Sequence, residues 1–377
     1  METITLIATA KFNLEPIVEA EIKTLGFRHI STTAGKVEFE ATIDQIPTAN
    51  LWLRCADRVL LKMGQFRAAT FEQLFEQTKA LPWEKWITPD GKFTVTANCV
   101  HSALRSARSS QSIVKKAVVT RLKESYSIDW FEETGPAYDV HVSLLNDVAT
   151  LTLNTSGDGL HKRGYRHSPV TAPLKETLAA GLVMISTWQK EGLLIDPMCG
   201  SGTILIEAAM MVRNMAPGLK RSFASEEWPS IGTAIWQKAR ADAKEAIIPS
   251  AKPTLFGYDI NKTNVKASKE NAHLAGVGKD IQFARKDIQD LWIDQQFGTI
   301  ISNPPYGMRI AEFSELNKIY RSLNKTFKKK KGWSLFILTA DEKFPSFFNR
   351  SAPDKEVLLN NGRLRATLYH YLADKQE

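Results

Sequence analysis

One short stretch combines residue types that could bind a small ligand: an apolar run ends in an acid and is followed by two glycines. It reads GLLIDPMCGSGTILIE from Gly192 to Glu207. Glycines let a ligand approach the backbone closely, and the N–H groups of a following helix can bind a carboxylate or phosphate. The third glycine of the dinucleotide fingerprint and the lysine of a phosphate-binding loop are both missing. Because Asp196 would repel a pyrophosphate, the stretch favours an amino-acid group, with its ammonium near Asp196.

Two further strand ends carry acids. Asp259 closes the apolar run TLFGYD and is placed to accept both hydroxyls of a ribose, although a helix-capping role also fits its position. Asp287 ends the next run and could receive an adenine amino group. Three successive strand ends with an acid, the first beside a glycine loop, predict a site for S-adenosylmethionine. The residues predicted to contact this cofactor are Asp196, Pro197, Cys199, Gly200, Gly202, Thr203, Asp259, Asp287 and Asn303.

The fourth strand ends in the sequence SNPPYG, which could activate a nucleobase amine. Such an amine is a poor nucleophile because its lone pair is delocalised into the ring. The Asn303 side-chain oxygen and an adjacent carbonyl, held rigid by Pro304, can accept its two N–H bonds, and the Tyr306 ring can stack on an extruded base. Asn303, Pro304 and Tyr306 are therefore the predicted catalytic residues. Cys199 is interpreted as a packing residue rather than a nucleophile, because it lies in the glycine loop.

The elements that must position these residues follow from the hydrophobic pattern. From residue 174 onward, strand-like runs alternate with helical patterns, which indicates a parallel sheet with helices on both faces. Near the end, Asn361-Gly362 lies between two alternating runs, a strong hairpin signal. A terminal antiparallel hairpin is typical of the methyltransferase variant of the Rossmann-like fold. The stretch between Asn214 and Ser250 is too long for an ordinary connection, and the sequence assigns it no role.

Two smaller units precede this domain. Residues 1–66 read as a small α/β unit, and residues 67–155 contain two helices, a strand and a hairpin that turns at Asn146-Asp147. Between residues 156 and 173, glycines, prolines and basic side chains replace the apolar pattern. We therefore predict the joint to the C-terminal domain there.

The charge balance favours a polyanionic partner. Lysine and arginine number 49 against 41 acidic residues, a formal net charge of +8. Exposed cations could follow RNA phosphates, although a merely solvated face is also possible. The predicted RNA-binding residues are Arg105, Arg108, Lys115 and Lys116.

Cysteine and histidine usage argue for a reducing compartment and against a metal site. The 3 cysteines and 7 histidines show no metal-ligand spacing, so no metal is predicted. The N-terminus lacks the basic region of a signal peptide, and no stretch approaches the ~18 apolar residues of a membrane span. We expect a cytoplasmic protein with no membrane association.

Together these motifs resemble those of the THUMP-domain RNA guanine-N2 methyltransferases. The resemblance is most specific in residues 192–207 and 302–307, and it extends to HKRGYR at 161–166 and APLKETLAA at 172–180. Residues 102–119 look like the second half of a THUMP domain. The nearest likeness is to the guanine-N2 module of the bacterial large-subunit rRNA methyltransferases.

The resemblance implies a particular domain layout. A ferredoxin-like unit would occupy residues 1–66, a THUMP RNA-binding domain 67–155 and a linker 156–173. A class I methyltransferase domain would occupy 174–377, with a seven-stranded, mostly parallel sheet. Bifunctional relatives carry a second methyltransferase module, which is not expected here because the chain ends too early.

The activity implied is methylation of the exocyclic N2 of a guanosine by S-adenosylmethionine, most simply in large-subunit (23S) rRNA. Three alternatives stay open: a tRNA guanine substrate, adenine N6 in DNA, and an RNA-binding protein with a vestigial methyltransferase domain. The likeness to an RNA-binding domain argues against DNA. The sequence leaves open a monomer or a weak dimer.

Overall fold

The computed structural model describes residues 2–166, 173–305, 310–328, 330–348, 352–362 and 364–374, with only the backbone at 310–315. The chain forms two compact units. The first contains Met1–Ala10, Glu19–Leu160 and Ser222–Asp242, and the second contains Lys11–Val18, His161–Arg221 and Ala243–Glu377. Each unit therefore includes a short segment that is distant in sequence from the rest of it. Among the described residues, no helix is both long and apolar enough to cross a lipid bilayer.

The first unit begins with a β-α-β-β-α-β arrangement. Its elements are β1 (Thr3–Thr9), α1 (Glu15–Thr24), β2 (Arg28–Thr33), β3 (Lys36–Thr42), α2 (Ile46–Trp52) and β4 (Arg58–Arg67). The strand order β2-β3-β1-β4 is that of a ferredoxin-like unit. Strand β2 was not expected from the sequence, because its residues RHISTT are mostly exposed and show no apolar alternation.

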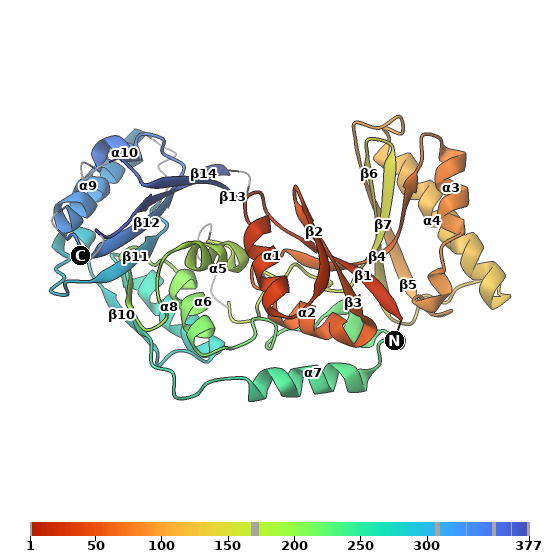
Figure 1. The fold of residues 1–377 in the computed structure, drawn as a ribbon, viewed down its shortest axis with the longest axis horizontal. Coiled ribbons are helices and arrows are strands. Elements are labelled where there is room, and N and C mark those ends of the chain that lie inside the picture. The colour runs from red at the N-terminus through yellow and green to blue at the C-terminus, as the bar shows by residue number, and fades with distance from the viewer. Residues whose placement is uncertain are drawn as a thin grey trace. The chain divides into compact units, whose positions relative to one another are not determined.

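The elements that follow extend the same sheet. They are α3 (Phe71–Lys79), β5 (Lys92–Val100), α4 (Ala107–Tyr126), β6 (Ala137–Leu145) and β7 (Val148–Asn154). Because β7 pairs with β4, the described strands form one continuous sheet of order β2-β3-β1-β4-β7-β6-β5. Helices α3 and α4 lie beside β5, β6 and β7 (Figure 1). The predicted hairpin turn is confirmed, with Asn146 and Asp147 at φ 52° and 61°.

The long stretch between Asn214 and Ser250 has a structural role that the sequence did not reveal. It leaves the second unit and returns to it at one place, where the Ile248 amide donates to the Arg213 carbonyl at 2.8 Å. Between these points, Ser222–Asp242 packs within the first unit. The Trp228 ring stacks on Tyr138 at 4.9 Å and its indole N–H donates to the Ala137 carbonyl. The stretch therefore completes the core of the first unit.

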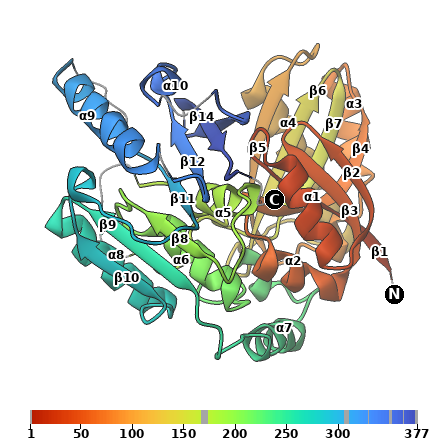
Figure 2. The same ribbon diagram turned by 60° about the vertical axis from the view of Figure 1, so that its left-hand side comes forward.

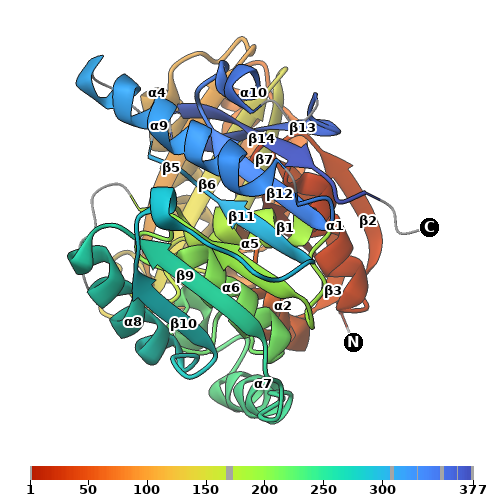
Figure 3. The ribbon, with the colours of Figure 1, turned by 90° about the vertical axis from the view of Figure 1, so that its left-hand side faces the viewer.

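The second unit carries the parallel sheet. Its strands are β8 (Leu193–Asp196), β9 (Thr254–Asp259), β10 (Ile281–Arg285), β11 (Gly298–Ser302), β12 (Trp333–Thr339), β13 (Lys355–Asn361) and β14 (Leu364–Tyr371). In the described chain they form a seven-stranded sheet of order β10-β9-β8-β11-β12-β14-β13, seen from two sides in Figures 2 and 3. The pairs from β10 to β12 are parallel, and β14 is antiparallel to both of its neighbours. The predicted fold class is confirmed.

The terminal hairpin differs from the prediction in one detail. Asn361 pairs with Leu364 and is thus the last residue of β13, whereas it was expected in the turn. Gly362 follows at φ 66°, a conformation that glycine adopts without steric cost.

Helices cover both faces of this sheet, as the pattern predicted. In Figure 1, α9 (Ile310–Phe327) and α10 (Phe344–Phe347) lie on one side, and α5 (Glu176–Ile185) and α6 (Thr203–Val212) on the other. Helix α8 (Lys262–Ala275) packs beside α6. Apolar residues of α9 and α10 pack against β11 and β12 in one buried cluster, which fixes the positions of these two strands.

The second unit also needs Lys11–Val18, although these residues lie far from it in sequence. Leu14 is fully buried, and a Cβ atom at Gly181 would come within 2.8 Å of its Cδ2 atom. Asn13 donates through its side-chain amide to the Leu358 carbonyl at 2.8 Å. A fragment that began near residue 160 would therefore lack part of the core of this unit.

We predict that Leu14→Ala destabilises the second unit by about 2–5 kcal/mol, because the truncation removes fully buried methyl groups and leaves a cavity. Calorimetric unfolding of the full chain would measure the change. Ile17→Ala, a partly exposed position on the same segment, is the control. Equal effects of the two substitutions would contradict the packing assigned to Leu14.

Candidate active site

A pocket of about 500 Å³ lies at the carboxyl ends of β8, β9, β10 and β11. Parallel strands bring residues that are far apart in sequence to one edge of the sheet, which explains why these segments meet there. The predicted residues that line the pocket are Asp196, Pro197, Cys199, Gly200, Thr203, Asp259, Asp287 and Asn303. Of the described residues that were predicted for cofactor binding or catalysis, Gly202 and Pro304 do not line it.

The two glycines of the loop have different roles. Gly200 has φ 51°, and a Cβ atom there would meet nothing within 4 Å, so its backbone borders open space in the pocket. Gly202 has φ 79°, and a Cβ atom there would come within 2.9 Å of the Phe283 ring and 3.0 Å of Ser268. Gly202 is thus required for close packing of α6 against its neighbours, and Gly200 is the residue that leaves the pocket open.

Asp196 is almost completely buried, with 2% of its surface exposed. Its Oδ1 atom accepts hydrogen bonds from the Ser302 hydroxyl at 2.7 Å and the Met198 amide at 3.2 Å. Burial raises the pKa of this carboxyl from 3.8 to about 7, against the lowering effect of these two hydrogen bonds. The bond to Ser302 ties the end of β8 to the residue that precedes Asn303.

Asp259 organises the glycine loop from the neighbouring strand. Its Oδ2 atom accepts from the Gly200 amide at 3.0 Å, and its Oδ1 atom accepts from the Asn261 amide at 2.8 Å and the Asn264 side chain at 3.2 Å. Helix α8 is capped by Asn261, whose side chain accepts from the Thr263 amide, so the capping role considered for Asp259 belongs to Asn261. Asp259 thus shapes the loop and also faces the pocket.

Asp287 and Cys199 make mainly structural contacts. Asp287 was predicted to end a strand, but β10 ends at Arg285. The Asp287 carboxylate accepts from the Gln289 amide at 2.9 Å and starts the short turn Ile288–Asp290. The Cys199 amide donates to the Tyr258 carbonyl at 2.8 Å, which joins the loop to β9. Burial raises the pKa of the Cys199 thiol well above its ordinary value, so the thiol stays protonated. These contacts support the interpretation of Cys199 as a packing residue.

Of the SNPPYG segment, Ser302 is the last residue of β11, and residues 303–305 follow it at the edge of the pocket. Asn303 is half-buried and lines the pocket together with the exposed Pro305, while Pro304 is buried. Tyr306, the third predicted catalytic residue, lies outside the described residues.

Several pocket residues were missed from the sequence. Ile260 and Ile288 each follow one of the strand-end acids, and Ile260 is 59% exposed at the pocket. An apolar residue directly after each acid is a signal that could have been read in the sequence. Lys286, whose ammonium lies 5.5 Å from the Tyr258 ring centroid, and Lys318 on α9 carried no such signal.

The four predicted RNA-binding cations lie in the first unit and are all exposed. Arg105 precedes α4, Arg108 lies in its first turn, and the other two lie further along the helix. Lys115 lies 5.8 Å from the Phe93 ring centroid and Lys116 5.7 Å from that of Phe75. Their alkyl chains thus cover apolar surface, and their ammonium groups remain available to an anion.

Within the described part of the chain, no three His, Cys, Asp or Glu side chains lie close enough together to hold a metal ion.

Three family models match the chain in order. The RlmL ferredoxin-like domain matches residues 5–60, the THUMP domain 68–154, and the RMKL-like methyltransferase domain 163–370. The last covers more than half of the chain. The chain belongs to the RMKL-like methyltransferase family. The resemblance proposed from the sequence motifs is thereby confirmed, as is the presence of the ferredoxin-like and THUMP domains.

Alignments with curated relatives cover almost the whole length of this RMKL-like methyltransferase. "Putative RNA methyltransferase YpsC" of Bacillus subtilis is 43% identical over 373 residues, covering 98% of this chain and 96% of its own. The Ribosomal RNA large subunit methyltransferase K/L of Syntrophotalea carbinolica is 34% identical, covering 98% of this chain and 53% of its own. The chain therefore spans about half the length of the K/L relative.

Solved structures show the same fold. A "predicted N6-adenine-specific DNA methylase" from Listeria monocytogenes superposes with a TM-score of 0.95 at 40% identity, covering 99% of this chain and 97% of its own. SMU.472, complexed with SAH, superposes with a TM-score of 0.94 at 37% identity over the full length of both chains. TrmN from Thermus thermophilus, at 19% identity and a TM-score of 0.70, shares the fold.

Proposed function

We propose that this RMKL-like methyltransferase transfers a methyl group from S-adenosylmethionine to the exocyclic N2 of a guanosine in large-subunit rRNA. The observation that carries the proposal is the presence of Asn303 in the same pocket as the glycine loop and the strand-end acids. One pocket thus has groups suited to a cofactor and a group suited to an exocyclic amine.

The residues of the pocket fit S-adenosylmethionine part by part. Gly200 leaves room beside its amide, and Asp196 offers a buried carboxyl to the ammonium of the amino-acid part. Asp259 faces the pocket for the ribose, and Ile260 and Ile288 offer apolar surface to the adenine ring. When bound, this cofactor supplies an electrophilic methyl group. The neighbouring structure complexed with SAH supports the same choice.

Asn303 is proposed to act on the base amine. Its side-chain oxygen would accept one N–H bond and draw the nitrogen toward a tetrahedral geometry with an available lone pair. The buried Pro304 fixes the backbone after Asn303, and Ser302 ties the backbone before it to Asp196. A group held in this way costs no reorganisation when positive charge develops on the nitrogen.

The domain content and the names of relatives support RNA as the substrate. The THUMP domain precedes the catalytic domain, and the curated relatives described above are named for RNA and for large-subunit rRNA. We propose the functional division 1–66, 67–155, 156–173 and 174–377, and a cytoplasmic protein that meets rRNA there.

The decisive experiment is methyl transfer from labelled S-adenosylmethionine to nucleic acid of a strain that lacks the gene, followed by nucleoside analysis. The expected product is N2-methylguanosine in 23S rRNA, and Asn303→Ala protein is the control for contaminating activities. Label in tRNA, or in adenine N6 of DNA as the name of the Listeria protein suggests, would replace this proposal. No transfer to any substrate would favour a vestigial domain.

The ionisation of Asp196 predicts a pH dependence of cofactor affinity. Its pKa is about 7, and a bound ammonium favours the charged form, so affinity should rise as pH rises toward 7. Binding below pH 7 should release a proton, measurable by calorimetry in buffers of different ionisation enthalpy. The free protein should become less stable over the same interval. A carboxyl pKa raised from 3.8 to about 7 stabilises the fold at low pH, and this stabilisation is lost as pH rises from 3.8 to about 7.

Asp196→Asn is the matched control for this prediction, because the amide keeps the shape of the carboxyl and does not titrate. Its affinity should be lower and nearly independent of pH over the same interval. A pH-independent affinity of the natural protein would exclude the proposed ionisation.

The four cations near α4 should contribute to RNA binding and not to cofactor binding. Replacing Arg105, Arg108, Lys115 and Lys116 with Gln should weaken RNA binding and reduce the salt slope by about 0.7–0.9 per lost phosphate contact. Cofactor affinity should not change. Lys238→Gln, at an exposed lysine of the first unit, is the control. An unchanged salt dependence of the fourfold variant would show that this face is only solvated.

A further inference from the structure

The segment His161–Arg166 reads HKRGYR and has no role in the function proposed above. In the structure it belongs to the second unit, where three of its side chains contact polar groups near the glycine loop. Two of these side chains, Arg163 and Tyr165, are almost fully buried. A buried arginine destabilises the fold unless its charge is paired, so the partners of these side chains are part of the structure of the site.

Arg166 contacts three polar groups on two segments of the chain. One guanidinium nitrogen, Nη2, donates to the Leu174 carbonyl at 3.0 Å and to the Thr203 hydroxyl at 3.1 Å. Another, Nε, lies 3.0 Å from the Glu176 carboxylate. Leu174 and Thr203 both line the pocket, whereas Arg166 itself does not. Arg166 thus contacts two walls of the pocket from behind.

The same segment holds the next turn of α6. The Arg163 Nε atom donates to the Glu207 carboxylate at 3.4 Å, and the Tyr165 hydroxyl donates to the same oxygen at 3.1 Å. Glu207 is fully buried and lies four residues after Thr203, one turn further on the same helix face. Burial raises the pKa of Tyr165 well above its ordinary value, so its hydroxyl stays a donor.

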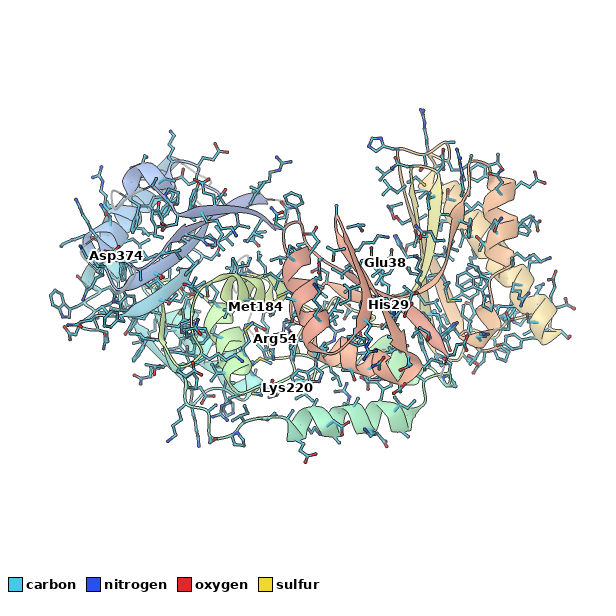
Figure 4. The ribbon with its side chains drawn as sticks, viewed as in Figure 1. His29, Glu38, Arg54, Met184, Lys220 and Asp374 are labelled. Carbon is cyan, nitrogen blue, oxygen red and sulfur yellow. The ribbon has the colours of Figure 1, made fainter. Side chains whose placement is uncertain are left out.

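Gly164 fixes the backbone between these side chains. It has φ 90°, and a Cβ atom there would overlap the carbonyl oxygen of Lys220, a residue labelled in Figure 4. The backbone at Gly164 is thus packed closely against the backbone of Lys220. The side chains of the segment are therefore held in place against α6.

We propose that Arg166 is a positioning residue for the cofactor site: it holds Thr203 at the end of the glycine loop and Leu174 at the pocket wall. The inference rests on the proposed binding of S-adenosylmethionine. The Arg166 guanidinium combines a nitrogen that donates to both a carbonyl and a hydroxyl with a permanent positive charge beside the Glu176 carboxylate, and no other side chain offers this combination. Without it, the first turn of α6 and the wall at Leu174 lose their common partner, so the pocket is less well preorganised.

The test compares Arg166→Gln with Arg213→Gln. Arg213 is a matched control: its side chain is 21% exposed against 20% for Arg166, and its partner Asp280 is 5% exposed against 7% for Glu176. Among the described residues, neither Arg213 nor Asp280 lines the pocket. Calorimetry should show a cofactor affinity about tenfold lower for Arg166→Gln, which corresponds to ~1.4 kcal/mol. The affinity of Arg213→Gln should stay within about twofold of the natural value.

Steady-state kinetics give a second measurement, the ratio of the two KM values, which a general loss of stability would not change. Arg166→Gln should raise the KM for S-adenosylmethionine and leave the KM for RNA unchanged. Arg166→Lys should be intermediate, because it keeps the charge and loses the fork. Glu176→Gln should lower cofactor affinity when Arg166 is present, and should add nothing in the Arg166→Gln protein.

The outcomes separate this inference from the proposed function. If the natural protein does not bind S-adenosylmethionine, the proposed function is wrong. If it binds and the Arg166 variants bind equally well, or no worse than Arg213→Gln, the positioning role is wrong. If Arg166→Gln does not fold, Arg166→Lys and Glu176→Gln decide the question by the same comparison.

Discussion

Asn303→Ala should lower kcat by roughly 10²–10³, which corresponds to about 2.7–4 kcal/mol, while the affinities for cofactor and RNA change little. The Asn303 oxygen is proposed to accept a hydrogen bond from an amine that becomes positively charged as the new bond forms. This interaction is stronger in the transition state than in the ground state, so its loss affects the rate more than the binding.

The surroundings of Asn303 argue against a purely structural cause for such a loss of kcat. Asn303 is half-buried beside the pocket, whereas the neighbouring Ser302 and Pro304 are buried and hold the backbone. A substitution at Asn303 therefore removes a group at the pocket and leaves the anchors on both sides. Asn303→Asp keeps an acceptor oxygen and should retain more activity than Asn303→Ala.

Single-turnover methyl transfer on a folded Asn303→Ala protein is the measurement, with cofactor calorimetry and thermal unfolding as controls. A transfer rate near that of the natural protein would exclude the mechanism. A loss of cofactor affinity as large as the loss of rate would instead assign Asn303 to binding.

Asp259→Ala should cause a loss of S-adenosylmethionine affinity of about 1.5–3 kcal/mol, the value of hydrogen bonds to a charged group. The carboxylate faces the pocket and also accepts from the Gly200 amide. Its removal would eliminate the proposed ribose contact and at the same time release the loop. We therefore expect a value near the upper end of this range.

Asp287→Ala is the natural comparison, because Asp287 lines the same pocket from the turn that follows β10. Its carboxylate accepts from Gln289 in its own turn and holds no part of the glycine loop. Its effect on affinity should be smaller than that of Asp259→Ala. Calorimetry on both variants tests the difference, and an unchanged affinity of folded Asp259→Ala would remove Asp259 from the site.

Patterns that act over a few residues were sufficient to predict much of this protein from its sequence. The glycine loop after β8, the acids at the strand ends and both hairpins depend on local backbone preferences and on the alternation of apolar residues. The order of strands and helices then implied the methyltransferase fold, and the edge of that parallel sheet implied that Asp196, Asp259 and Asn303 lie together. The family models confirm the fold and the family, and the roles of these residues stay predictions.

The partners of the site residues were decided only by the tertiary structure. Ser302 bonds to Asp196, 106 positions away, and Asp259 bonds to the Gly200 amide, because adjacent strands bring them together. Nothing in the sequence near Arg166 indicates that its guanidinium reaches Thr203. A hydrogen bond between distant residues depends on the register and packing of whole elements, which no local pattern specifies.

The same reason explains why residues 11–18 were assigned to the N-terminal unit and why the stretch from 214 to 250 was assigned no role. Leu14 fills a space beside Gly181 in the second unit, and Trp228 stacks on Tyr138 in the first. In the sequence each reads as an ordinary apolar residue of its own neighbourhood. Hydrophobic burial has no preferred direction, so the sequence determined that these side chains would be buried, and only the assembled fold decided in which unit.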